Sequence, residues 1–211
     1  MICEACDTNN TDDAAFCAEC GRPFGAAVPG RLVKHSFSQR ILGAIMLRSA
    51  MYEEVEADTT ATPQALFVVL WVSLLTSLII LASGLEDIGL TELALGTLRE
   101  VVSWAVLAMI TLFIGSTLLR DPNTHADWGQ LARTLGCAQA PGILRVAIFI
   151  PGIGGLLFFA SVVLQLMAMV VAVRQALDYT STVRAIIVVV LSFIPYVLFR
   201  GVFESILATF V

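Results

Sequence analysis

The run IGGLLFFASVVLQLMAMVVAV, residues 153–173, has 21 residues and no charged side chain, and it decides the fold class. A helix needs roughly 20 predominantly apolar residues to cross the hydrocarbon core of a bilayer. Two more uncharged runs, each of 19 residues, occupy positions 64–82 and 101–119. Together these runs predict helices whose solvent is lipid.

The composition of the whole chain agrees with this prediction. Hydrophobic residues make up 58% of the 211 residues, charged residues only 14%, and the mean hydropathy is +0.87. A typical soluble domain has about 25% charged residues. The net charge of −5 excludes the strongly basic surface of a nucleic-acid-binding protein. The first ten residues lack the basic start and apolar stretch of a signal peptide, so we expect the N-terminus to stay in the cytoplasm.

Two further spans are less regular. Residues 131–150 are interrupted by Arg133, Pro141 and Arg145, which predicts either a kinked third span or a re-entrant hairpin. The last span bends where Pro195 removes a backbone donor. The predicted fold class is an all-α membrane protein with a bundle of about five transmembrane helices. The predicted spans are residues 64–82, 101–119, 131–150, 153–173 and 185–207, and an acidic loop is predicted between the first two, over residues 83–100.

Basic residues predict the orientation, because short cytoplasmic loops are enriched in Lys and Arg. With five spans, nine basic residues lie inside and two outside. A re-entrant third segment changes the ratio to nine against three. Both ratios place the N-terminus in the cytoplasm of a multi-pass cell-membrane protein, and they leave the side of the C-terminus open. With five spans, the inside residues are Arg22, Arg31, Lys34, Arg40, Arg48, Arg120, Arg133, Arg174 and Arg184.

Residues 1–25 form a separate small domain with two CxxC pairs. Cys3 and Cys6 are the first pair, Cys17 and Cys20 the second, and ten residues separate the pairs. Two such turns bring four thiolates into a tetrahedral zinc site with no open position for catalysis. Disulfides or reactive thiols are the alternative, but the reducing cytosol favours Zn²⁺. The sequence FCAECGRPF, residues 16–24, resembles the short zinc ribbons of bacterial membrane and regulatory proteins.

The charge of this ribbon indicates its kind of partner. Five acidic residues stand against Arg22 alone, which disfavours phosphate and therefore nucleic acid. We expect the ribbon to dock a cytoplasmic protein. Residues 26–36, with Pro29 and Gly30, are predicted to be a linker.

Residues 37–62 are predicted to be an interfacial amphipathic helix and an acidic segment. A helix packed on the membrane bundle is the alternative. The basic residues of the linker and of this helix are expected to contact anionic lipid headgroups, and the acidic residues of the segment to form a solvated face or gather a cation. The basic residues are Arg31, Lys34, Arg40 and Arg48, and the acidic ones are Glu53, Glu54, Glu56 and Asp58.

Four residues form a candidate intramembrane polar site. Arg145 either faces a polar cavity or extends its side chain to the outer interface. Gln165, near the middle of its span, needs a partner on another helix. Arg200 and Glu204 are one turn apart and are expected to neutralise each other. Breaks at proline and glycine residues around the third segment keep a transport function open, because broken helices form substrate sites in transporters.

Three stretches resemble the Yip family of multi-span membrane domains, named for interaction with Ypt/Rab GTPases. They are MYEEVEAD (51–58), LARTLGCAQAPG (131–142) and AVRQALDYTSTVRA (172–185). The resemblance implies a Yip-type transmembrane domain over residues 63–211, with about five helices and a cytoplasmic N-terminal region. The chain looks prokaryotic and carries a ribbon in place of a long disordered arm, so the trafficking role is not carried over. The family assigns no catalytic residues.

The sequence therefore predicts a non-catalytic membrane scaffold whose ribbon recruits a cytoplasmic protein. The alternative is a small-solute or ion transporter or channel that uses the broken third segment. A metal or redox sensor is a third hypothesis. A homo-oligomer is compatible with the sequence.

Overall fold

The computed structural model describes residues 2, 8–11, 19, 35–83, 89–122, 124–207 and 209. The chain divides into two units, residues 1–34 and 35–211. In the first unit an antiparallel bridge joins Ile2 to Asn9. The predicted zinc ligands Cys3, Cys6, Cys17 and Cys20, and the basic residues Arg31 and Lys34, lie outside the described residues.

The second unit is built from helices, and no strand occurs in its described part. Four of its helical segments are long and apolar enough to cross a membrane: Thr59–Ser83, Thr91–Leu118, Gly154–Ala176 and Thr182–Leu207. Large apolar side chains such as Leu156 and Leu198 remain 69% and 68% exposed on their outer faces. This confirms the predicted class of multi-pass membrane protein, because lipid is the solvent that accepts such faces. The elements are α1 (Phe37–Ile45), α2 (Ser49–Ala57), η1 (Thr59–Ala61), α3 (Thr62–Ser83), α4 (Leu90–Phe113), η2 (Ile114–Leu118), α5 (Trp128–Cys137), η3 (Ala140–Phe149), α6 (Gly154–Ala176) and α7 (Thr182–Leu207).

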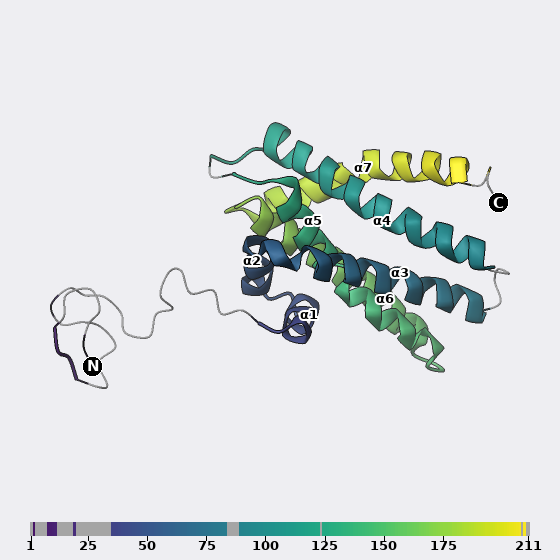
Figure 1. The fold of residues 1–211 in the computed structure, drawn as a ribbon, viewed down its shortest axis with the longest axis horizontal. Helices are drawn as coiled ribbons and strands as arrows, with labels where there is room; N and C mark the ends of the chain where they lie inside the picture. The colour runs from purple at the N-terminus through teal and green to yellow at the C-terminus, as the bar shows by residue number, and fades with distance from the viewer. Residues whose placement is uncertain are drawn as a thin grey trace. The chain divides into compact units, whose positions relative to one another are not determined.

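The predicted amphipathic helix is two short helices, α1 and α2. Ser36 begins α1 with a capping box that includes Gln39. The chain turns between the helices, where Leu47 has a φ of 57°. The hydroxyl of Tyr52 donates to the carbonyl of Ala44 at 3.1 Å across this corner. The two helices lie at the end of the bundle where α3 begins (Figure 1).

Helix α4 begins at Leu90, eleven residues before the predicted span, so the prediction of a loop over residues 90–100 was wrong. Glu92 in the first turn favours this start, because a carboxylate is stabilised at a helix N-terminus. At its other end α4 continues into η2, one turn of π-helix. The hydroxyl of Tyr179 donates to the carbonyls of Gly115 and Leu119 at 2.7 and 2.9 Å and holds this turn.

The predicted third span is not one continuous helix but α5 followed by the 3₁₀-helix η3. Pro141, at the start of η3, has no backbone N–H to continue α5. Close contacts place the two pieces along α3. A Cβ on Gly136 would lie 2.8 Å from the Cβ of Ala65, and one on Gly142 would lie 2.6 Å from Val72. The broken segment therefore runs in the same direction as α3.

Helices α4 and α7 run antiparallel along their whole length (Figure 1). Arg200, late in α7, pairs with Glu100, early in α4, at 2.6 Å. Arg184, early in α7, pairs with Asp121, which follows α4. These two ion pairs mark opposite ends of the bundle.

Candidate functional site

A cavity of about 470 Å³ lies between α3, α4, η3, α6 and α7. Its volume is within the range of small-molecule sites, about 300–1,000 Å³. Polar side chains on the wall are unusual for an apolar bundle, where polar groups mark functional sites by default. The polar lining residues are Ser73, Thr76, Ser77, Arg99, Glu100, Gln139, Arg145, Gln165, Tyr196 and Arg200.

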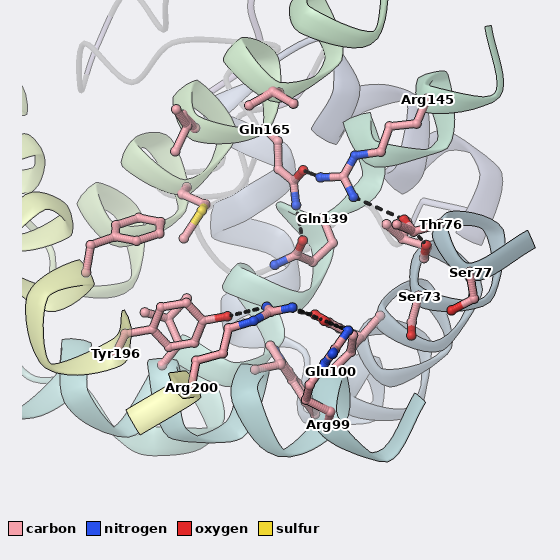
Figure 2. Close-up of a pocket in the computed structure, with 18 of the residues that line it drawn as sticks. Ser73, Thr76, Ser77, Arg99, Glu100, Gln139, Arg145, Gln165, Tyr196 and Arg200 are labelled. Atoms are coloured by element: carbon pink, nitrogen blue, oxygen red, sulfur yellow. Dashed lines mark hydrogen bonds and ion pairs between the residues drawn. The ribbon is translucent and has the colours of Figure 1, made fainter. Parts of the chain in front are cut away.

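One wall of the cavity carries Arg145, from η3. One of its terminal nitrogens, Nη1, donates to the hydroxyl of Thr76 on α3 at 3.1 Å. The other, Nη2, donates to the amide oxygen of Gln165 on α6. The amide nitrogen of Gln165 in turn donates to Gln139, between α5 and η3. This chain of hydrogen bonds ties the broken segment to the helices on both sides of it (Figure 2).

The opposite wall carries a cluster of ion pairs from α4 and α7 (Figure 2). Arg200 donates to Glu100 at 2.6 Å and to Glu204 at 3.3 Å. Arg99 lies 3.5 Å from Glu100 and 3.4 Å from Glu204. The hydroxyl of Tyr196 accepts from Arg200 at 3.2 Å. Two arginines and two glutamates balance one another on this wall.

The lining of the cavity has three arginines and one glutamate. Glu100 and Glu204, which lies beside the lining, pair with Arg99 and Arg200, so the charge of Arg145 is the one left in excess. In the described part of the chain no ion pair includes Arg145, whose bonded partners are both neutral. Three buried polar atoms on the wall also have no hydrogen-bond partner: Ser73 Oγ, Arg99 Nε and Arg145 Nε. Unsatisfied buried polar atoms are rare in folded proteins, so these three atoms mark the wall as able to hydrogen-bond a further polar group.

The structure brings the four predicted polar residues into one region. Gln165 has the interhelical partner expected of it, and that partner is Arg145. Arg145 lines the cavity and donates to Thr76, in agreement with the first of the two predictions made for it. Arg200 and Glu204 form the predicted pair, although both also bind residues of α4.

Sequence reasoning missed the contributions of α3, α4 and Gln139. A signal for α3 was present, because Ser73, Thr76 and Ser77 follow the i, i+3, i+4 spacing of one helix face. No comparable signal marked Glu100, which was assigned to a loop. Its role depends on α4 starting early and on α7 packing beside it.

A second polar cluster holds the α1–α2 corner. Arg40 is only 2% exposed and donates to Glu54 at 2.7 Å and to Asp58 at 2.7 Å. The prediction that Arg40 contacts lipid headgroups does not agree with this burial, because its charge is taken up by carboxylates inside the protein. Arg48 is exposed, as headgroup contact requires. The predicted solvated acidic face also needs correction, since Glu54 is 6% exposed.

The ionisation of this cluster follows from its contacts. Burial alone would raise the pKa of Glu54, but hydrogen bonds from His35 and Arg40 outweigh it and lower the pKa. Hydrogen bonds from Thr60 and Arg40 lower the pKa of Asp58. Both carboxylates therefore stay charged and fix Arg40.

Residues 51–58, 131–142 and 172–185, on which the predicted resemblance depends, meet at this same end of the bundle. Arg133 donates to the backbone carbonyls of Val55 and Glu56 at 3.2 and 2.5 Å. The side chain of Glu56 accepts from Gln130 at 3.0 Å. Burial, followed by the nearby carboxylates of Asp178 and Glu53, raises the pKa of Glu56 to about 7.

Among the described residues, no three His, Cys, Asp or Glu side chains are grouped as a metal site. Cys137 is buried at 4% exposure, in the core between α5 and its neighbours. Comparison of the chain with protein-family models, curated proteins and solved structures finds no match. The functional interpretation therefore depends on the cavity itself.

Proposed function

We propose that this protein binds a small polar solute in the cavity and carries it across the membrane. The observation that supports this most is a 470 Å³ cavity with ten polar side chains, bordered by helices whose outer faces are apolar. Its wall includes the break between α5 and η3. Transporters place substrate sites at such discontinuous helices, because an interrupted helix exposes polar groups within the bilayer.

Five crossings of the membrane are part of this proposal. The ion pairs of Arg200 and Arg184 support an antiparallel arrangement of α4 and α7. A short connection joins α6 to α7, so α6 runs parallel to α4 if both cross. The chain must then return across the bilayer between α4 and α6. The segment α5–η3 has ten α-helical and ten 3₁₀ residues, about 35 Å at their usual rises, which suits a core of about 30 Å.

This topology, with a cytoplasmic N-terminus, puts the C-terminus on the outer side. The exposed Arg48 and the predicted ribbon then face the cytoplasm. Ser77 and Ile80, late in α3, place the cavity in the half of the bundle away from α2. In this arrangement the zinc ribbon is a cytoplasmic attachment that docks a protein partner, and a solute site in the membrane is compatible with it.

Flux in proteoliposomes tests the proposed function. Purified protein is reconstituted and supplied with a panel of small neutral, anionic and cationic solutes. We expect transport of at least one class, reduced about tenfold by Gln165→Leu because Arg145 and Gln139 lose their shared partner. The control is Gln175→Leu, the same change on α6 outside the cavity. Absence of flux for the whole panel would contradict the proposal.

A further inference from the structure

We infer that the solute is a small anion with a carboxylate or phosphate group, and that Arg145 is the residue that binds it. This inference rests on the proposed function and names the class of its solute. It starts from the charge of the cavity. Arg145 is the one lining cation that the described residues leave without a carboxylate partner.

The guanidinium of Arg145 has donors to spare. It carries five N–H groups, and two hydrogen bonds, to Thr76 and Gln165, are formed. Nε is buried and without a partner. Arginine matches carboxylate and phosphate because its planar fork can donate two parallel hydrogen bonds to them. The bonds to Thr76 and Gln165 hold this fork in place without neutralising it.

As far as the structure describes them, the surroundings of Arg145 offer no free carboxylate. Gln165 uses its amide oxygen on Arg145 and its nitrogen on Gln139. On the opposite wall Arg99 Nε is buried without a partner. Glu100, the carboxylate in the lining, is already shared by Arg99 and Arg200. A cation would therefore meet an excess positive charge with no free carboxylate to receive it.

The membrane strengthens this preference. Coulomb interactions are stronger where the effective dielectric constant is low, and an unpaired charge inside a bundle is unfavourable until a counter-charge arrives. An anion in the cavity supplies that counter-charge and accepts from the unused N–H groups. The anionic group has two sources, a soluble organic or inorganic anion or the headgroup of an anionic lipid.

Binding measurements on the full chain test the inference. The protein is held in phosphatidylcholine nanodiscs and titrated calorimetrically with benzoate and inorganic phosphate, with neutral benzamide and cationic benzylamine as matched probes. We expect at least one of the two anions to bind, and Arg145→Gln to weaken it about tenfold or more. Arg120→Gln, at an exposed arginine outside the cavity, should leave the affinity unchanged. Glu100→Gln should tighten binding because it removes a negative charge from the lining.

A second measurement requires neither a known ligand nor an Arg145 variant that folds. Ser77→Cys places a thiol on the cavity wall. A negatively charged thiosulfonate should react with it faster than a positively charged one, relative to the rates at an exposed control thiol. Adding Glu100→Gln should raise this preference about fivefold. The opposite preference for the cationic reagent would overturn the inference.

Further outcomes distinguish a soluble anion from a lipid headgroup, and the anion inference from the proposed transport function. The lipid is the source if phosphatidylglycerol co-purifies with the wild type, competes with benzoate and is lost in Arg145→Gln. Benzoate or phosphate binding without such a lipid identifies the soluble source. Binding of neither anion, equal binding of benzamide, or anion binding that does not depend on Arg145 overturns the inference. Flux of a neutral solute without anion binding would overturn the inference and leave the proposed transport function standing. Arg145-dependent anion binding without flux would support the inference and contradict transport.

Discussion

Arg145 and Gln165 hydrogen-bond directly although 20 residues separate them in the chain. The bond joins the middle of the 3₁₀-helix η3 to α6. Because Gln165 also donates to Gln139, one amide holds both sides of the break. Arg145 thus gives the cavity its excess charge and also takes part in the hydrogen bonds that hold its wall together.

The turn into α6 provides a test of the broken segment. A Cβ on Gly154 would lie 2.1 Å from the carbonyl oxygen of Ile148, whereas a Cβ on the adjacent Gly155 meets nothing within 4 Å. We expect Gly154→Ala to lower the free energy of unfolding by about 2 kcal/mol or more, because backbone has to shift. Gly155→Ala should change it by less than about 0.5 kcal/mol. Thermal unfolding in detergent measures both, and equal effects would contradict the close approach.

The buried acid at the α2 end predicts a pH dependence of stability. Burial and the nearby Asp178 raise the pKa of Glu56 to about 7 in the folded state. A raised pKa means that the folded state binds the proton more tightly, so stability falls as pH rises from about 4.5 to about 7. We expect a loss of about 1–2 kcal/mol after solvent screening.

Glu56→Gln should remove this loss, because the amide stays neutral. Glu54 and Asp58 remain ionised in this range since their pKa values are lowered, so they do not add to the change. The measurement is the unfolding midpoint of both proteins from pH 5 to pH 8. Identical pH profiles for wild type and variant would show that Glu56 does not titrate in this range.

The ion cluster at the α1–α2 corner predicts unequal roles for two arginines. Arg40→Gln leaves the buried Glu54 without its cation and should cost about 3–5 kcal/mol. Arg48→Gln changes an exposed residue and should cost less than about 0.5 kcal/mol. The same unfolding assay distinguishes them. If Arg48→Gln proved the more destabilising, the assignment of Arg40 to the interior would be wrong.

Metal analysis tests the predicted ribbon. We expect about one zinc per purified chain, since two CxxC pairs supply four thiolates. Cys17→Ser combined with Cys20→Ser should abolish the zinc. Cys137→Ser is the matched control, because Cys137 is a buried thiol in α5 and belongs to neither CxxC pair. Wild-type protein without zinc, or zinc that survives the double substitution, would refute the ribbon.

The sequence predicted the membrane helices because hydropathy is a local property. Runs such as 153–173 need no partner to be recognised. The break at Pro141 was also predictable, whereas α7 continues as one helix through Pro195, where a bend was predicted.

Contacts between distant residues could not be predicted in this way. Nothing local to Arg40 indicated that Glu54 and Asp58 would surround it, because that depends on the turn at Leu47. The direction of Arg145 likewise depends on η3 having 3₁₀ geometry, which places its side chain between Thr76 and Gln165. The sequence shows the charged residues, but the packing of distant segments determines which residues they contact.

The central claim is a solute-binding cavity in the outer half of the bundle, and labelling of single thiols tests it most directly. In intact cells a membrane-impermeant thiol reagent should modify Ser77→Cys on the cavity wall, and it should modify Ala57→Cys, at the exposed end of α2, only in inverted vesicles. The wild-type chain gives the background from its own cysteines. A Ser77→Cys thiol that reacts from neither side, or only in inverted vesicles, would contradict the account.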